Sequence, residues 1–434
     1  MNANKLMYIL GGVIVVAVFI TIVFILRGVG STTSQPATLQ FWGVFDNRTV
    51  FDRVIQDFRA QNPSIDVKYS MFTYEQYEQA LVNGLAAGGG PDILMIHNTW
   101  LPKHGDKLAS MPSEIPDKKT PFTIQDFKNE FVDVAHQDMI FGNQVYALPL
   151  YIDTLALFYN KDLFNSAGIT RPPRTWEEVN GSVQLLTKFD SQGNISQSGI
   201  ALGTARNINR STDILAGMMI QSGVEMTSDD NSSATFGSQI GGQYLGEIAL
   251  QYYTDFANPR KQIYSWNNTQ HYSIDAFVEG NLAMMIGYSH QIPVIRAKAP
   301  RLNFSIAPMP QASVTDIRNL SNYWGVGVSR TSANTTAAWK FVHYLASRDG
   351  ASTYLNNSGR PSARRDLIDL QRSDPDLGIF AVQALTARSW FQADNVIIEG
   401  IFADMIDDVN FGRATIRDAI DRAASRVTVL MQRQ

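Results

Sequence analysis

The regular alternation of short apolar segments with amphipathic helices, beginning near residue 38, constrains this chain more than any other feature. Residues 39–44 have the length and apolar character of a buried strand, and Val50, Val54 and Phe58 then fall on one face of a helix. The pattern repeats, with strands expected at 65–69 and 93–96 and a helix between them. Strands that alternate with such helices pair in parallel, so we expect an α/β domain whose ligand site lies beyond the carboxyl ends of its strands.

A second region of this kind is expected between residues 151 and 303. At 434 residues the chain exceeds one ordinary domain of about 100 to 200 residues, so two domains are predicted. From Phe341 onward the pattern is mainly helical. The final helix has an apolar stripe at Ile416, Ile420, Val427 and Met431, with spacings that place these side chains on one face.

The segment from Met7 to Leu26 is an unbroken apolar run long enough to cross a bilayer, which takes about 20 residues. Arg27 and a polar linker up to Pro36 follow it, without a small-residue cleavage site beside the run. We therefore interpret residues 1–37 as an uncleaved N-terminal transmembrane anchor and linker, which holds the rest of the chain on the extracytoplasmic side of the cell membrane. A cleaved signal peptide is the alternative, and it too exports the chain.

Composition excludes several kinds of function. The net charge of −4 gives no attraction for the phosphates of nucleic acids. The chain contains no cysteine, so it can form no disulfide, thiolate nucleophile or cysteine zinc site. Its histidines form no His-Glu-x-x-His pair, and Gly88 to Gly90 lack the following Lys-Ser or Lys-Thr of a phosphate loop. We expect no cofactor, no metal and no nucleic-acid partner.

Several longer motifs carry more specific information, and their order along the chain is informative. They are "YALPLYIDTLALFYNKDLFNSAGITRPPRTWEEV" from Tyr146, "GLAAGGGPDILMI" from Gly84, "AFVEGNLAMMIG" from Ala276, "YWGVGVS" from Tyr323 and "GRPSARRDL" from Gly359. Together they resemble the bacterial extracellular solute-binding proteins, family 1, to which maltose-binding protein is related. The departure is at the N-terminus, where many relatives carry a lipid-modified cysteine.

This resemblance implies a two-lobed periplasmic-binding-protein type II fold, with a hinge that the chain crosses more than once. Lobe 1 would comprise 38–150 plus 305–345, and lobe 2 would comprise 151–304 plus 346–434. The implied function is that of a monomeric, non-enzymatic solute-binding component of an ABC importer, which closes on a sugar or oligosaccharide and delivers it to a membrane permease.

Sugars present hydroxyl groups at their edges and C–H groups on their faces, so their sites combine aromatic rings with carboxylates and amides. We place Trp42 and Asp46 in the first strand-to-helix loop, where Asp46 could instead cap the helix. The resemblance places an acidic ligand contact at Asp153 and a stacking ring at Tyr288. The predicted ligand-binding residues are Trp42, Asp46, Trp100, Tyr151, Asp153, Trp266, Tyr288, Trp324 and Arg360.

Three other functions stay open at this point. A polyamine would also fit aromatic rings paired with carboxylates, because cations stack on aromatic faces. An exported glycoside hydrolase needs two carboxyl groups that flank one bond, and only Asp46 and Asp153 stand out, on opposite sides of the expected cleft. A sensor that presents its solute to a membrane receptor would share the same fold.

Overall fold

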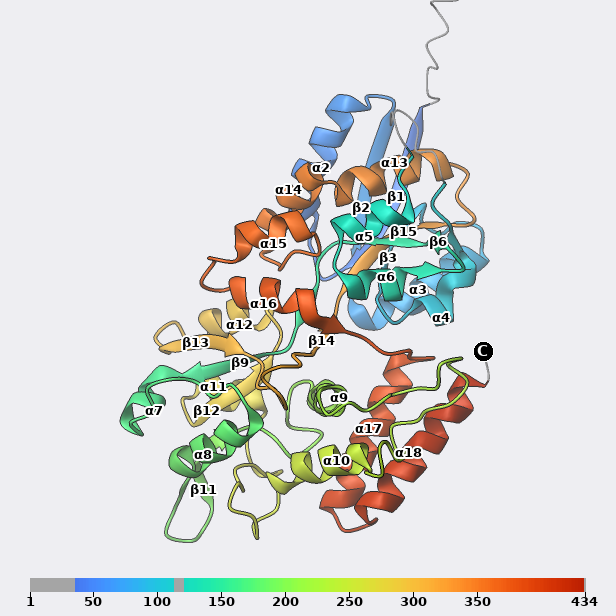
Figure 1. The fold of residues 1–434 in the computed structure, drawn as a ribbon. Coiled ribbons are helices and arrows are strands. Elements are labelled where there is room, and N and C mark those ends of the chain that lie inside the picture. The colour runs from blue at the N-terminus through green and yellow to red at the C-terminus, as the bar shows by residue number, and fades with distance from the viewer. Residues whose placement is uncertain (1–35, 113–120, 433–434) are drawn as a thin grey trace, which may run out of the picture.

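The computed structural model of the protein describes residues 36–112 and 121–432 (Figure 1). The expected anchor at 7–26 therefore lies outside the described residues. Within the described ranges, no helix is both long and apolar enough to cross a membrane. The described chain forms two α/β lobes, one above the other in Figure 1, which we call lobe 1 and lobe 2.

Lobe 1 is built on a mixed sheet in the order β2-β1-β3-β15-β4, with β7 also paired to β15. The first strand is parallel to both its neighbours, as the alternating pattern predicts, whereas β15 returns from a distant part of the chain and runs antiparallel to β3. The strands are β1 (Ala37–Val44), β2 (Ile65–Phe72), β3 (Ile93–His97), β4 (Leu108–Ala109), β7 (Ala147–Pro149) and β15 (Trp324–Ser329).

The helices of lobe 1 cover its sheet with apolar faces. Val50, Val54 and Phe58 of α2 are buried, as the spacing predicts, and the side chain of Asn47 caps this helix by accepting a hydrogen bond from the Thr49 N–H. The remaining elements are α2 (Arg48–Gln61), α3 (Tyr74–Ala86), α4 (Leu101–His104), α5 (Ile124–Glu130), α6 (Asp133–Met139), β5 (Ile140–Phe141), β6 (Gln144–Val145), α13 (Thr335–Ala346), α14 (Arg348–Ser358) and α15 (Arg365–Gln371).

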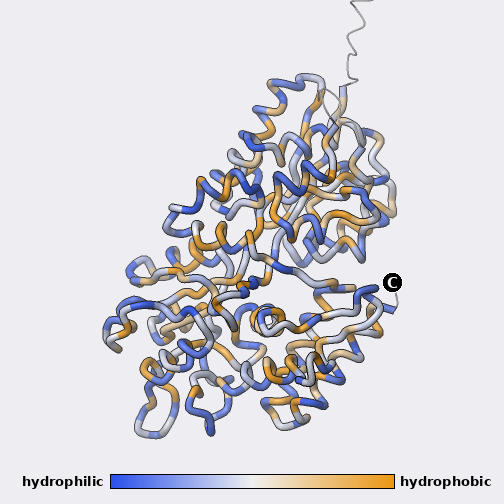
Figure 2. Tube along the Cα trace, in the orientation of Figure 1, coloured by the Kyte–Doolittle hydropathy of each residue, from blue (hydrophilic) through white to orange (hydrophobic). Residues whose placement is uncertain are grey.

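Lobe 2 has a second mixed sheet in the order β10-β11-β12-β9-β13. Its strands are β9 (Ala156–Asn160), β10 (Lys188–Phe189), β11 (Ile195–Ile200), β12 (Leu282–Gly287) and β13 (Phe304–Pro308). Its helices are α7 (Lys161–Ser166), α8 (Trp176–Leu186), α9 (Ser211–Gln221), α10 (Leu245–Asp255), α11 (Ser273–Val278), α12 (Gln291–Lys298), α17 (Asn395–Asn410) and α18 (Ile416–Met431). The hydropathy tube shows apolar segments running through the interior of both lobes (Figure 2).

A third, small sheet lies where the chain passes between the lobes. It contains β8 (Asp153–Thr154), β14 (Asn319–Asn322) and β16 (Ala387–Arg388), in the order β16-β14-β8, and α16 (Gly378–Gln383) lies beside it. Each strand comes from a different part of the sequence, so the described chain crosses between the lobes at three places. Such a narrow connection is where two lobes can rotate relative to each other.

The buried apolar residues form two clusters, one in each lobe. Ile306 belongs to the lobe 2 cluster because β13 pairs with β9, and Tyr354 belongs to the lobe 1 cluster because α14 packs on α2. The lobe boundaries predicted from the sequence, at 305 and 346, place these two segments in the opposite lobes. Strand pairing and helix packing, which local patterns do not report, decide where each crossing begins.

Candidate functional site

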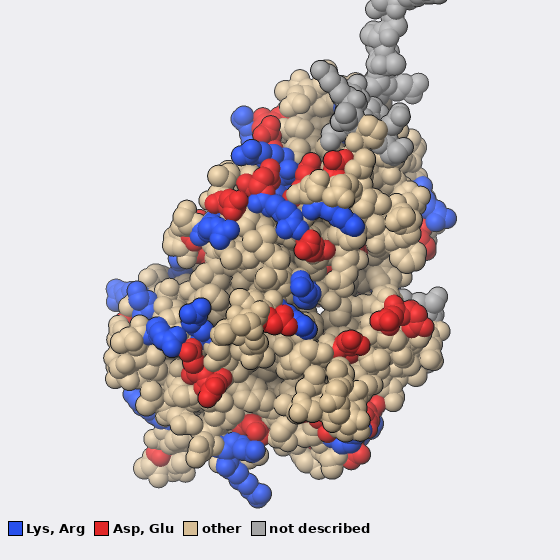
Figure 3. All heavy atoms as spheres, in the orientation of Figure 1, with Lys and Arg blue, Asp and Glu red and all other residues tan. Residues whose placement is uncertain are grey.

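A cleft between the two lobes contains the best candidate for a solute site. An inner cavity of about 50 Å³ lies between the end of β3, the start of α9, the strand β14 and the start of α17. It adjoins an outer pocket of about 810 Å³, since Asn98, Thr99, Ser389, Trp390 and Gln392 line both. The space-filling view is notched where the lobes meet, and on that face acidic and basic side chains are interspersed (Figure 3). Residues of both lobes therefore line one small inner space.

Arg210 brings a positive charge to this cavity. It precedes α9 in a left-handed conformation, with φ of 59°, which a residue with a side chain adopts at some cost. No carboxylate oxygen of the described residues lies within 4.0 Å of its guanidinium, which is 6.0 Å from the centre of the Tyr288 ring. Burial lowers the pKa of Arg210, but nearby Asp213, Tyr288 and Glu399 raise it above its ordinary value. The cation is therefore retained without being neutralised by a direct ion pair.

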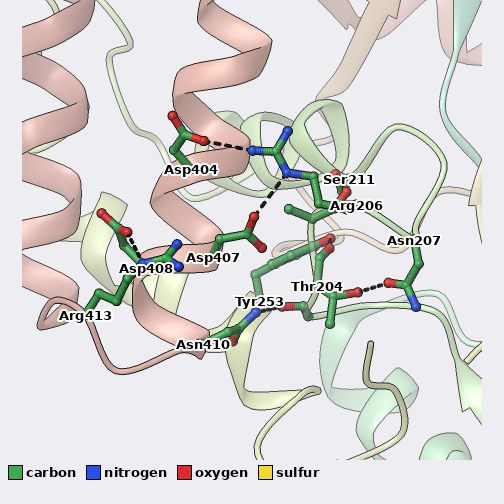
Figure 4. Close-up of polar contacts among 12 residues, drawn as sticks. Thr204, Arg206, Asn207, Ser211, Tyr253, Asp404, Asp407, Asp408, Asn410 and Arg413 are labelled. Carbon is green, nitrogen blue, oxygen red and sulfur yellow. Dashed lines mark hydrogen bonds and ion pairs between the residues drawn. The ribbon is translucent and has the colours of Figure 1, made fainter. Parts of the chain in front are cut away.

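The loop that carries Arg210 is fastened to the neighbouring helices. Asn410 donates to the Gly203 carbonyl at 2.7 Å, and the Tyr253 hydroxyl donates to the Thr204 carbonyl at 2.9 Å. Arg206 in the same loop reaches α17 by pairing with Asp404 and Asp407, as Figure 4 shows. These contacts hold residues 203–206, in the loop that leads to Arg210.

Two carboxyl groups and a neutral histidine share the cavity with Arg210. Asp213 accepts a hydrogen bond of 2.9 Å from the Tyr288 hydroxyl. Burial, and then the charge of Asp213, raises the pKa of Glu399 above its ordinary value. Burial lowers the pKa of His97 to about 4, so its ring is neutral and bonds Thr99 and Asn322. The set offers both donors and acceptors at fixed positions.

Aromatic surface comes from the segment after β16. Trp390 is 8% exposed, packs against Phe402 at 5.9 Å between ring centres, and lines both the cavity and the outer pocket. Its indole N–H is buried without a hydrogen-bond partner among the described residues. A buried donor left unpaired costs free energy.

None of the nine residues predicted from the sequence is among the residues that line the inner cavity or the outer pocket. Trp42 lies within β1 rather than in the loop after it, is half-buried and packs on Phe72. Asp46 does not cap α2, because Asn47 does so. Asp46 is instead buried and bonded to Arg360 at 2.8 Å and to the Tyr354 hydroxyl at 2.7 Å.

Three of the predicted residues belong to the interior of lobe 1. The Tyr151 ring lies 4.4 Å beneath the Arg360 guanidinium. Trp100 and Trp324 are each 2% exposed, and their rings meet edge to face at 5.0 Å. These rings stabilise one another in the core.

The other three lie in or beside lobe 2. Trp266 is fully buried. Asp153 accepts hydrogen bonds from the backbone and hydroxyl of Ser289, the latter at 2.7 Å. Tyr288 is also buried and reaches the cavity through its bond to Asp213.

Sequence reasoning missed the residues that do line the cavity, above all Arg210, Asp213, Trp390 and Glu399. Arg210 and Asp213 flank "ST" at a helix start, and Trp390 precedes Asp394, which caps α17. The signal that the sequence offered for these residues was a polar side chain at the start of a helix. Without the fold, helix starts that face the cleft cannot be told from those that face solvent.

Comparison with known proteins identifies the family. Residues 45–352 match the profile described as bacterial extracellular solute-binding protein. The chain belongs to this family, so the resemblance carried by its motifs is confirmed, and with it a solute-binding protein rather than an enzyme. Membership also makes the protein extracytoplasmic.

Individual relatives share the fold at low identity. The sn-glycerol-3-phosphate-binding periplasmic protein of Escherichia coli O1:K1 / APEC is 23% identical over 437 residues, covering 91% of this chain and 93% of that protein. The sugar-binding protein MalE from Xanthomonas citri superposes with a TM-score of 0.76 at 20% identity, over 92% of this chain and 98% of its own. The cyclic alpha-maltosyl-1,6-maltose binding protein from Arthrobacter globiformis has the same TM-score and identity, over 92% and 100%. These matches confirm the α/β periplasmic-binding-protein fold.

Proposed function

We propose that this protein captures a sugar or oligosaccharide in the cleft between its lobes and delivers it to the permease of an ABC importer. The observation that carries the proposal is the inner cavity, which is lined by the guanidinium-bearing Arg210, by the two carboxyl-bearing residues Asp213 and Glu399, and by Trp390. A sugar hydroxyl both donates and accepts, so it can bond this mixed set, while its C–H face packs on Trp390. Among the relatives, both MalE and the Arthrobacter protein are sugar-binding by name.

The geometry favours an oligosaccharide over a polyamine. A polyamine carries several positive charges, and these are repelled by Arg210, a lining residue whose charge no described carboxylate pairs directly. The outer pocket of about 810 Å³ extends the inner cavity and has room for further sugar rings. Trp390 lies at the junction and is the natural stacking surface for a ring that spans both spaces.

Closure of the two lobes supplies the transport step in this proposal. Residues of both lobes line the cavity, so a solute makes its full set of contacts only when they are together, and that differential contact favours the closed state. The permease would distinguish the closed from the open form. Segment 7–26 would tether the lobes to the membrane outside the cell, which cell fractionation of the full chain can test.

The direct test is a thermal-shift screen against oligosaccharides, monosaccharides, polyols and polyamines, since a ligand of the native state raises its melting temperature. An oligosaccharide should give the largest shift, and Arg210→Met and Glu399→Gln should each weaken its binding about tenfold or more. Glu279→Gln is the control, because Glu279 pairs with His271 on the surface, away from the cleft. A response to polyamines alone, or unchanged affinity in both cleft variants, contradicts the proposal.

A further inference from the structure

Two side chains of lobe 1 reach across the cleft to the first residues of α17 in lobe 2. The Trp100 indole N–H donates to the side-chain oxygen of Asn395 at 3.0 Å, and the Lys103 ammonium group donates to Asp394 at 2.6 Å. In Figure 1, α4 lies at the lower edge of lobe 1, and α17 runs down through lobe 2 from its upper edge, to the right of β14. These contacts join the lobes directly and do not pass through the crossing strands.

Lobe 1 holds Lys103 in position for this contact. Lys103 also pairs with Glu78 of α3 at 2.5 Å, and the same carboxylate bonds the His104 ring at 2.8 Å. These two partners lower the pKa of Glu78 to about 2, with His104 the larger cause, so Glu78 is charged at neutral pH. Lys103 thus lies between two carboxylates, one from each lobe, with 30% of its side chain exposed.

The lobe 2 partner is tied to the solute cavity. One oxygen of Asp394 accepts from the N–H groups of Val396 and Ile397 and so caps α17, while the other accepts from Lys103. The helix that begins here carries Asn395 and Glu399 into the cavity. Lys103 therefore fixes the start of an element whose next turn lines the solute site, without lining the site itself.

We propose that Trp100 and Lys103 form an interlobe latch, which stabilises the closed arrangement by binding Asn395 and Asp394 and thereby positions α17 for the solute. The latch is made of protein groups alone, so it favours closure before any solute is present. The latch rests on the proposed function and deepens it, because it makes the free energy of lobe closure more favourable. A bound solute then shifts the same equilibrium further toward the closed form. The role of Trp100 is thus to hold the lobes together by its N–H, not to stack on the solute.

The chain contains no cysteine, so two introduced cysteines give a clean measurement of the distance between the lobes. Lys128→Cys on α5 and Val429→Cys on α18 place spin labels on exposed positions of lobes 1 and 2. Pulsed electron spin resonance on the solute-free protein then reports the distribution of separations. We expect the unsubstituted latch to give mainly the short distance of the closed form, and Lys103→Met to shift the closed-to-open ratio toward open by roughly 3- to 10-fold.

Matched variants distinguish loss of the latch from a general loss of stability. Lys103→Arg keeps the charge and should restore the short distance, whereas Lys107→Met removes a lysine whose ion pair among the described residues is with Asp106 of lobe 1, and should change nothing. Asp394→Ser keeps a capping oxygen for α17 but loses the charge, so it should open the lobes as Lys103→Met does. Trp100→Phe should act in the same direction, because it keeps a ring in the core and removes the N–H.

A predominantly long distance in the unsubstituted protein, or a distribution that Lys103→Met and Trp100→Phe leave unchanged, would overturn the proposal. Circular dichroism of each variant shows that it is folded before its distances are read. The measurement uses no solute, so its outcome is independent of whether the cleft binds a sugar. In the thermal-shift screen, a loss of solute affinity in Lys103→Met that Lys103→Arg rescues would then link the latch to the site.

Discussion

Removing Arg360 should destabilise lobe 1, because it leaves a carboxylate buried without its counter-charge. The Arg360 and Asp46 side chains are only 12% and 5% exposed, and the two nitrogens of Arg360 lie 2.8 and 3.2 Å from one oxygen of Asp46. Tyr354 donates to the other oxygen at 2.7 Å. Asp46 follows Phe45, whose φ of 64° is strained for a large residue, so the cluster also fixes the turn after β1.

The expected magnitude follows from this burial. Breaking a buried ion pair by deleting one partner costs about 3 to 5 kcal/mol, whereas replacing both charged groups with apolar ones costs far less. Arg360→Met should therefore lower the free energy of unfolding of lobe 1 by about 3 kcal/mol or more, since the cation that stacks on Tyr151 is lost as well. The double variant Asp46→Leu with Arg360→Met should cost less than the sum of the single variants.

Urea denaturation followed by circular dichroism on the four proteins of this double-mutant cycle measures the coupling energy. Arg348→Met is a suitable control, because Arg348 is 61% exposed and lies 3.9 Å from Asp366. A loss below about 1 kcal/mol for Arg360→Met, comparable with a surface pair, would refute the buried-pair argument. Normal stability combined with lost solute affinity would instead restore Arg360 to the binding site.

Two further predictions concern groups next to the cleft. Trp324→Ala should lower the free energy of unfolding by about 3 to 5 kcal/mol, because the ring is 2% exposed and packed on Trp100. The variant protein that remains folded should keep most of its solute affinity, as measured by calorimetry. Asp138 is buried, accepts from Tyr323 at 2.8 Å and from Ser389, and burial raises its pKa to about 6 from 3.8. The stabilisation that Asp138 contributes is therefore full below about pH 4 and is lost as the pH rises through about 6, by up to about 3 kcal/mol. Asp138→Asn should flatten the fall in melting temperature over that pH range. A variant whose melting temperature falls with pH as in the unsubstituted protein would contradict this prediction.

Local periodicity was sufficient to predict the first strands and helices of lobe 1 and the final helix. The strands β1, β2 and β3 and the apolar face of α2 follow from spacings of two and of three to four, because side-chain direction repeats with those periods in any environment. The final helix has the same property, with Ile420 and Val427 buried as its stripe predicts. Motifs that are contiguous in the chain carried the family, which the match over residues 45–352 then confirmed.

The solute site was decided by tertiary structure. Asn98, Arg210, Trp390 and Glu399 come from distant segments, and only the three crossings between the lobes bring them around one cavity. An aromatic residue at a strand end, such as Trp324, has the same local sequence signal whether it faces a solute or another ring. Its direction depends on which strands pair beside it and which helices close over it, and those are long-range interactions that residue types and spacings do not encode by themselves.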